Sequence, residues 1–354
     1  MANIPDFFGL NLGHNSIKIA QSKAISKDKA KLVTLGSTPT AIGILENDSA
    51  KGQEMLAQEI ARSYKEIGVK TKNCVMSVSE VLVFSRLITL PRMNDNEVDE
   101  AIQYALKPLV PIPIENINIS FLKIDEKRIE GNSFSNWYVV AAPKQLILKY
   151  QQIIEKAGLN LLAIETEALA ITRMIAFNYP TEVTKDTMIL DMGAENTNVI
   201  LSRNGVVIFS QTISTGSEAI TKVIASDFGI DFVQAEKYKV TFGINFQNGE
   251  GKIARSIEPI LQIIVGEIQR TLTYYHEKIG GTSISTVFLT GGGADLPALE
   301  EYLKDKLNMN VKLANPLNGI EVEKNIKDNL SQMQIKGFNV ALGLSLKGFI
   351  NNYG

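Results

Sequence analysis

A strand-turn-strand pattern with a small polar turn occurs twice in this chain, 180 residues apart. The first copy is FFGLNLGHNSIKIA at residues 7–20, and the second is TMILDMGAENTNVILS at residues 187–202. Asn11 and Gly13 in the first copy fall at Asp191 and Gly193 in the second. Short alternating apolar runs indicate β-strands. Either copy alone could be an ordinary β-hairpin, but matching places in the two halves predict an internal duplication.

Turns of this kind are suited to binding phosphates. Glycine has no Cβ, so the backbone can approach a ligand closely. Backbone N–H groups can then hold a phosphate while a carboxylate such as Asp191 holds a metal ion. A third turn, Gly291-Gly292-Gly293, follows an apolar run at residues 286–290 and precedes a predicted helix. It matches neither the P-loop nor GxGxxG. Its alternative interpretation is a strand-to-helix loop with a packing glycine.

Composition excludes several classes of protein. With 354 residues, two lobes are expected. The net charge of −2, from 36 basic and 38 acidic residues, gives no case for binding nucleic acid or an acidic membrane. The single cysteine, Cys74, cannot form an internal disulfide, which fits a reducing compartment. The chain has no apolar run long enough to span a bilayer, so we expect a cytoplasmic protein.

Residues 82–164 predict a compact α+β module within the first half. Their apolar and polar runs follow the order β-α-β-β-α-β, with Asn94 or Asp95 as a helix cap. Three prolines at 108, 111 and 113 impose a stiff, extended connection inside this module. Such a connection could shape a binding groove or serve only a structural purpose.

Five segments, in this order, resemble the actin-like ATPase superfamily, in which two duplicated lobes close around ATP. They are FGLNLGHNSIK, IETEALAITR, LDMGAENT, AEKYK and VFLTGGGADLPALEEYL. More closely, the chain resembles the PilM family of type IV pilus assembly proteins over essentially its whole length. The stretches YALKPLVPIPIENINISF, VKLANPLNGIE and GFNVALGLSLKG are all similar to that family. The module at 82–164 is similar to the inserted subdomain of PilM and of its relative FtsA.

The resemblance implies an α/β fold of the actin-like (ribonuclease H-like) type, a duplicated two-lobe ATPase fold with an inserted α+β subdomain in the first lobe. We expect the first lobe at residues 1–81 together with 165–185. The inserted β-α-β-β-α-β interaction subdomain is expected at 82–164. The second lobe is expected at 186–354, with its outer subdomain at about 214–283.

The resemblance also implies that ATP and Mg²⁺ bind between the lobes. The implied nucleotide-binding residues are Asn11, Gly13, His14, Asn15, Ser16, Lys18, Asp191, Gly193, Glu195, Asn196, Thr197, Gly216, Ser217, Glu236, Lys239, Gly291, Gly292, Gly293 and Asp295. Lys18 either reaches a phosphate or is a solvated strand residue. Glu236 and Lys239 either hold ribose and adenine or form an exposed ion pair, which is worth roughly a few tenths of a kcal/mol.

The implied metal-binding residues are Asp191 and, through water, Asn11. The family usually has an aspartate at the position of Asn11, and an amide brings no charge. Losing one of two carboxylates should weaken Mg²⁺ binding more than the adenosine contacts. Glu165, Asp191 and Glu195 are candidates to orient an attacking water. We therefore expect nucleotide binding with weak or absent hydrolysis.

In the PilM family the partner is PilN, an inner-membrane protein whose short cytoplasmic N-terminal segment binds in a groove beside the inserted subdomain. The resemblance implies a similar groove here and recruitment to the membrane only through this partner. Contacts with other pilus assembly proteins and self-association are further expectations. Two alternatives remain. One is an FtsA-like division protein, which carries a C-terminal amphipathic tail, whereas here Gly354 closely follows the last predicted helix at 339–351. The other is a small-molecule kinase of the same superfamily.

Overall fold

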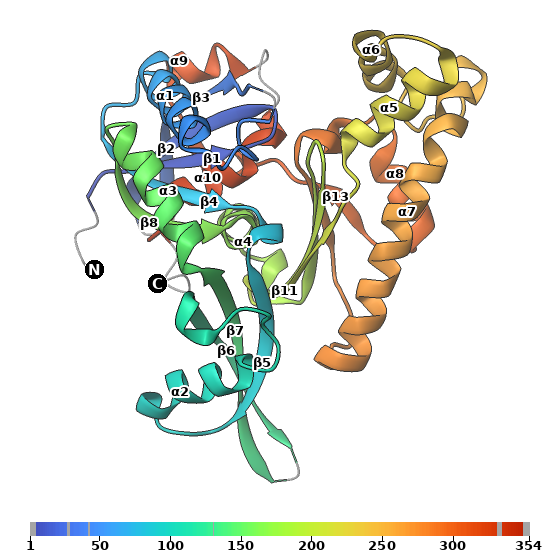
Figure 1. Ribbon diagram of the computed structural model, residues 1–354. Helices are drawn as coiled ribbons and strands as arrows, with labels where there is room; N and C mark the ends of the chain where they lie inside the picture. Colours follow the sequence, from blue (N-terminus) through green and yellow to red (C-terminus); the bar gives the residue numbers. More distant parts are fainter. Residues whose placement is uncertain (1–4, 27–28, 42, 130, 331–334, 350–354) are drawn as a thin grey trace.

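Two β-sheets with the same internal strand order form the cores of the two lobes (Figure 1). The structure is a computed structural model that describes residues 5–26, 29–41, 43–129, 131–330 and 335–349. The first sheet has the order β14-β3-β2-β1-β4-β8. Its strands are β1 (Phe8–Leu12), β2 (Ser16–Ser26), β3 (Lys29–Pro39), β4 (Asn73–Val78), β8 (Asn160–Thr166) and β14 (Ile320–Val322).

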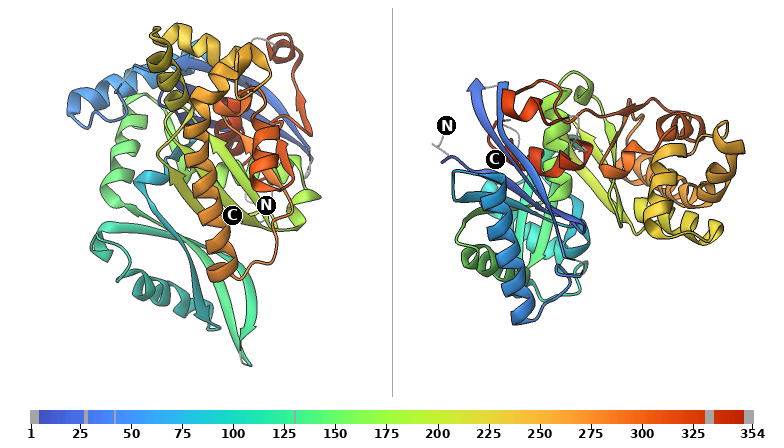
Figure 2. Two further views of the ribbon diagram at one scale, coloured as in Figure 1. Left: turned by 90° about the vertical axis from the view of Figure 1, so that its right-hand side faces the viewer. Right: turned by 90° about the horizontal axis from the view of Figure 1, so that it is seen from above.

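The second sheet has the order β11-β10-β9-β12-β13. Its strands are β9 (Thr187–Met192), β10 (Thr197–Arg203), β11 (Val206–Ile213), β12 (Val287–Thr290) and β13 (Val311–Leu313). In both sheets the first strand pairs antiparallel with the second and parallel with the fourth. Four helices lie on the side of this sheet away from the first lobe (Figure 2). They are α5 (Ser217–Phe228), α6 (Phe232–Phe242), α7 (Lys252–Tyr274) and α8 (Leu299–Leu307).

The two polar turns are equivalent in hydrogen bonding as well as in sequence. Gly13 N donates to Ser16 O over 3.0 Å, and Gly193 N donates to Asn196 O over 2.9 Å. Each bond closes a turn between the first and second strands of its sheet. The predicted internal duplication is confirmed.

The first lobe also contains α1 (Ala50–Ile67). Ser49 accepts a hydrogen bond from Gly52 N at its start, and Gly68, with φ 78°, ends it in the left-handed region. Its buried residues Leu56 and Ile60 share an apolar cluster with Ile153 of α3 (Lys144–Lys156). Both helices therefore belong to the core of the first lobe.

The inserted sheet is smaller than the predicted module. Its strands have the order β5-β7-β6, with β5 (Phe84–Pro91), β6 (Ile117–Ile129) and β7 (Asn132–Pro143), and α2 (Asp95–Leu106) packs on it. The sequence assigned the next helix and strand to this module as well. Instead α3 packs with α1, and β8 pairs in parallel with β4. The physical reason is that β4 gives β8 a parallel partner in the first sheet. A local sequence pattern does not reveal a partner so far away along the chain.

The end of the chain returns to the first lobe, although the sequence assigned residues 186–354 to the second. β14 pairs in parallel with β3, and α10 (Asn339–Ser345) packs against β1, β2 and α4 (Glu167–Asn178). Every residue of α10 is buried, so an amphipathic surface position in the second lobe would not suit it. The predicted end of this helix at residues 350 and 351 lies outside the described residues.

Glycines allow α10 to lie directly against its neighbours. A Cβ on Gly343 would lie 1.9 Å from Ala170 O in α4. A Cβ on Gly9 would lie 2.3 Å from Ala341 O. Backbone therefore meets backbone on two sides of the helix, which fixes its position between the first sheet and α4. The short α9 (Lys324–Lys327) precedes it on the way back from β14.

Candidate functional site

A cleft of about 1290 Å³ lies between the two lobes. Its walls include the turn between β1 and β2, the turn between β9 and β10, and the glycine turn after β12. The start of α5, one face of α6 and residues 337–340 also line it. Three turns that are far apart in the sequence therefore face one space.

Most of the residues predicted to bind nucleotide line this cleft. They are Asn11, Gly13, His14, Asn15, Ser16, Lys18, Asp191, Gly193, Glu195, Asn196, Ser217, Glu236, Lys239, Gly291, Gly292, Gly293 and Asp295. Two others, Thr197 and Gly216, lie behind the second turn. Thr197 Oγ1 donates to Thr215 O over 2.8 Å. A Cβ on Gly216 would lie 2.4 Å from Ala194 O, so only glycine lets α5 start against this turn.

Gly291 brings the third turn into contact with Asp191. Its φ is 90°, which favours glycine, and a Cβ there would lie 2.6 Å from Asp191 Oδ1. No described atom lies within 4 Å of the corresponding Cβ position on Gly292. The turn therefore presents backbone to the cleft on one side and contacts a carboxylate on the other.

Asp191 is a buried carboxylate at the end of β9. Its Oδ1 accepts a hydrogen bond of 2.5 Å from Asn339. Burial raises its pKa, whereas hydrogen bonds from Asn339 and Asn198 and the charge of Lys18 oppose that rise. Burial in turn lowers the pKa of Lys18, against the charges of Asp191 and Glu167. Lys18 is thus a cleft residue facing the carboxylates rather than a solvated strand residue.

Glu167 is a further carboxyl group of the cleft, and the sequence did not identify it. It is the first residue of α4, and its Oε1 accepts a bond of 3.4 Å from Asn11 Nδ2. Burial, with smaller contributions from Asp191 and Glu80, raises its pKa to about 8. Thr166 caps the helix by accepting from Leu169 N. The pair Thr166-Glu167, a helix cap followed by an acidic residue, was the sequence signal that could have identified Glu167.

The structure places Glu165, predicted as a candidate to orient water, outside this cleft. It forms ion pairs with Arg173 Nη1 at 2.8 Å and with Lys347 Nζ at 2.5 Å. Burial favours its neutral form, but the charges of these two cations leave its pKa below the usual value. The helix α4 begins at Glu167, and this glutamate rather than Glu165 faces the cleft.

Two side-chain contacts cross the mouth of the cleft. Asn15 Nδ2 donates to Glu218 Oε1 over 2.8 Å. His14 Nδ1 lies 3.2 Å from Glu195 Oε2 and 3.7 Å from Glu46 Oε1. The contacts with Glu218 and Glu195 join the first turn to the second lobe, and the contact with Glu46 stays within the first lobe. Polar groups therefore line the mouth of the cleft.

Lys239 of the Glu236–Lys239 pair is buried, whereas the alternative interpretation predicts an exposed pair; the Glu236 side chain is 41% exposed. Lys239 is only 7% exposed, and its Nζ lies 2.7 Å from Glu236 Oε2 and 2.9 Å from Thr221 Oγ1. Thr221 also donates to Glu236. The pair therefore links α5 to α6 at the cleft wall. Apolar lining residues that the sequence did not identify lie beside it: Ile220, Phe232, Val240 and Leu296.

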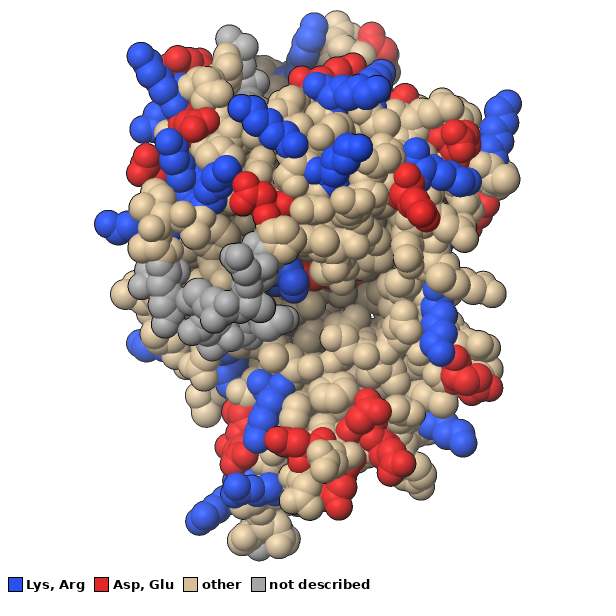
Figure 3. Space-filling model, turned by 90° about the vertical axis from the view of Figure 1, so that its left-hand side faces the viewer, with Lys and Arg blue, Asp and Glu red and all other residues tan. Residues whose placement is uncertain are grey.

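A second cavity, of about 520 Å³, lies between the inserted sheet and the first lobe; we call it the insert groove. Figure 3 shows a hollow on this face of the molecule. It is lined by residues 118–122 of β6 and 161–166 of β8, which are edge strands of their sheets. Glu165, Arg173 and Lys347 also line it.

The sequence model of the family described as "Type IV pilus assembly protein PilM" matches residues 9–349. The chain belongs to the PilM family. A structure titled "PilM-PilN type IV pilus biogenesis complex" superposes with a TM-score of 0.84, at 26% identity over 98% of this chain and 99% of that one. MreB5 of Spiroplasma citri bound to AMPPNP has a TM-score of 0.53 at 13% identity, over 97% and 95% of the two chains, and shows the fold alone. The predicted actin-like two-lobe fold is confirmed, and the chain is an actin-like protein of type IV pilus assembly.

Curated relatives include the cell division protein FtsA of Enterococcus faecalis, 27% identical over 50% of this chain and 44% of that protein. FtsA of Streptococcus pneumoniae is 22% identical over 89% of this chain and 77% of that protein. The chain spans about half the length of the first curated relatives it matches. Within the described ranges, every helix is too short or too polar to cross a membrane.

Proposed function

We propose that this chain binds ATP with Mg²⁺ in the cleft and assembles, from the cytoplasmic side, with a PilN-like protein of the inner membrane. The convergence of three glycine-bearing turns on one buried aspartate carries the first half of this proposal. All three turns line the cleft, and the third places glycine backbone next to Asp191. Backbone N–H groups of such turns can bind phosphate. The MreB5 structure titled as bound to AMPPNP shares this fold.

The residues present fit a magnesium nucleotide. Asp191 supplies a carboxylate, and Asn11 still has an amide oxygen, since its nitrogen donates to Ser77 Oγ over 3.1 Å. The positive charge of Lys18 interacts with the carboxylate of Asp191. When bound, Mg²⁺ would offset the charge of the phosphates. Ile220, Phe232 and Val240 would give the adenosine end an apolar wall.

Thermal unfolding tests the nucleotide site. Ligand at 100 times its Kd stabilises the folded state by about 2.7 kcal/mol, so Mg·ATP should raise the melting temperature by a few degrees. Asp191→Ala should remove this shift, whereas Asp305→Ala, at an exposed position of α8, should retain it. The absence of any shift with millimolar ATP or ADP would reject the nucleotide site.

We infer that hydrolysis is weak or absent. A general base must accept a proton from the attacking water. Glu167, with a pKa of about 8, is mostly protonated at neutral pH and is a poor acceptor. Asn11 also removes a charge from the metal site. Phosphate release measured with Mg·ATP tests this inference, and turnover comparable to that of active actin-like ATPases would reject it.

The insert groove is the proposed site of the PilN-like N-terminal segment. An extended peptide can pair with an exposed strand edge, and this groove has the edge strands β6 and β8 in its two walls. The solved complex of a PilM with a PilN is of the same family. Through this contact the chain would be a peripheral protein at the inner membrane. Other pilus assembly proteins and further copies of the chain are additional proposed contacts.

A labelled peptide of the PilN-like N-terminal segment tests this half of the proposal. Leu162→Asp, in the groove wall and 43% exposed, should weaken peptide binding at least tenfold. Leu148→Asp is the matched control, because Leu148 is 54% exposed on α3 and lies outside the residues that line the groove. Equal effects of the two substitutions would place the peptide elsewhere.

A further inference from the structure

The inserted sheet is held differently on its two sides. The chain enters it after β4 at Val83 and leaves it at Pro143, so it is covalently part of the first lobe. On that side β7 contacts α3, and the insert groove lies between the sheet and both β8 and α4. On the other side β5 and β7 contact β11 of the second lobe directly. Leu87 and Ile124 of the insert also pack against the apolar core of the second lobe.

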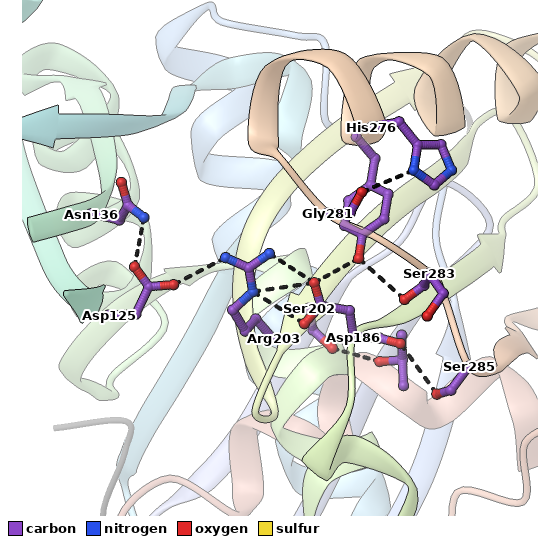
Figure 4. A network of polar contacts seen from close by, with 11 residues as sticks. Asp125, Asn136, Asp186, Ser202, Arg203, His276, Gly281, Ser283 and Ser285 are labelled. Carbon is purple, nitrogen blue, oxygen red and sulfur yellow. Dashed lines mark hydrogen bonds and ion pairs between the residues drawn. The ribbon is translucent and has the colours of Figure 1, made fainter. Parts of the chain in front are cut away.

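A charged bridge joins the insert to the second lobe (Figure 4). Asp125 Oδ2 of β6 lies 3.0 Å from Arg203 Nη1 at the end of β10. Arg203 also pairs with Asp186, at 2.8 Å from Nη2. Tyr275 OH donates to Asp186 over 2.7 Å. Arg203 is thus fixed within its own lobe, and Asp125 is the member of this network that crosses from the insert.

The insert is built to present Asp125 to the second lobe. The pairing of β6 with β7 shifts register between Lys123 and Asp125, and such a bulge redirects side chains. Asn136 of β7 donates to Asp125 Oδ1 over 2.5 Å, and Thr89 of β5 donates to Asn136 over 2.7 Å. The carboxylate is therefore supported by both other strands of its sheet.

A second set of contacts converges on Ser210 of β11. Its hydroxyl lies 3.0 Å from Ser85 Oγ and 3.2 Å from Tyr138 OH, both in the insert. It also donates to Glu80 Oε2 over 2.9 Å. The insert therefore has two polar attachments to the second lobe, one neutral and one charged, in addition to the apolar contact.

We propose that the inserted sheet follows the second lobe when the cleft closes on a ligand, and that the Asp125–Arg203 bridge thereby couples the cleft to the insert groove. A rotation of the second lobe relative to the first would carry the attached sheet with it. Because the groove lies between this sheet and the first lobe, its width would change. The proposal rests on the nucleotide and peptide sites proposed above and assigns the regulation between them.

Coupling of this kind has a measurable size and must be reciprocal. If ATP changes peptide affinity by some factor, the peptide changes ATP affinity by the same factor. Couplings are commonly about 5-fold or more, and we expect at least that in the wild-type chain. The physical route is a hinge motion of the lobes around the bound ligand. Packed interfaces then change between discrete arrangements and do not deform continuously.

Asp125→Asn isolates the bridge. It keeps the size of the side chain, removes the charge that Arg203 contacts, and leaves the Arg203–Asp186 pair intact. We expect nucleotide affinity without peptide to stay within about twofold of wild type, and the coupling factor to fall below about two. Glu126→Gln is the matched control, because Glu126 is the next residue and pairs with Lys123 inside the insert. This control should couple as the wild type does.

The experiment measures affinity for the labelled N-terminal peptide with and without saturating Mg·ATP, and the converse, by calorimetry. Binding of both ligands to the wild type without mutual effect would overturn the coupling, as would wild-type coupling in both Asp125→Asn and Arg203→Gln. Failure of either ligand to bind the wild type would instead reject the proposed function, and the coupling with it. A reduced coupling factor in both Asp125→Asn and Arg203→Gln, beside an unchanged Glu126→Gln control, supports the bridge.

Discussion

Asn339 Nδ2 lies 2.5 Å from Asp191 Oδ1, and this hydrogen bond joins the last helix of the first lobe to the carboxylate at the end of β9 in the second. Both side chains are buried. Asn339 also accepts from Val340 N through its oxygen, which orients the amide nitrogen toward Asp191. A buried carboxylate needs such donors, since an unpaired charge inside a protein is costly.

Asn339→Leu should therefore lower the free energy of unfolding by about 2 kcal/mol, the usual worth of a hydrogen bond to a charged group. Urea denaturation at neutral pH measures this change. Asn329→Leu is a suitable control, because Asn329 is exposed and, among the described residues, its side chain bonds only the backbone oxygen of Asn325. Equal stability of the Asn339→Leu variant and the wild type would show that Asp191 does not depend on this donor.

Glu167 gives a prediction for pH. Its pKa is about 8 in the folded chain against an ordinary 4.5, because burial favours the neutral form. The folded state then binds the proton more tightly than the unfolded state. The stability from this group is present below pH 4.5 and is lost as the pH rises through 8.

Glu167→Gln, which removes this titration, should match the wild type at about pH 4 and become more stable than the wild type as the pH rises toward 8. The difference should grow by at most about 1.4 kcal/mol per pH unit. Urea titrations from about pH 4 to pH 9 measure it. Burial also raises the pKa of Glu80, but that group is common to both proteins. A difference that does not vary with pH would contradict the assigned cause.

Asn11→Asp should strengthen the dependence of nucleotide affinity on Mg²⁺, because it adds a second carboxylate beside Asp191. It should also lower the stability of the nucleotide-free chain by about 1–3 kcal/mol, since donors to Ser77 and Glu167 are lost. Combining it with Glu167→Gln should recover part of that stability, because glutamine can donate to the new carboxylate. An unchanged metal dependence would count against a role of this position in metal binding.

The sequence revealed the polar turns because their chemistry is local. Glycine, a polar residue and flanking strands within about ten residues identify a turn wherever it lies. The residues that the sequence missed depend on tertiary contact. Asn339 meets Asp191 from a helix 148 residues away. Glu167 differs from the predicted Glu165 by two positions, and helix starts are uncertain by that amount.

Sheet membership was missed for a related reason. The sequence predicted β8 as a strand of the inserted module and did not predict β14, and their partners β4 and β3 lie far away along the chain. Parallel pairing leaves no turn signal, because the connection passes through helices. The first lobe therefore contains more of the chain than the local pattern suggests.

The packing of α10 gives a last prediction, which concerns stability alone. A methyl group on Gly343 would lie 1.9 Å from Ala170 O, so Gly343→Ala must push α10 away from α4. Overpacking of this kind costs about 1–3 kcal/mol, and the hydrogen bond from Arg173 Nη1 to Gly343 O, 2.9 Å long, would be strained as well. Gly266→Ala in α7 is the matched control, because no described atom lies within 4 Å of its Cβ position. Removing a mid-helix glycine there should stabilise the chain by about 0.5–1 kcal/mol. Urea denaturation should thus give opposite signs for two identical substitutions, and the same sign for both would contradict the close contact between α10 and α4.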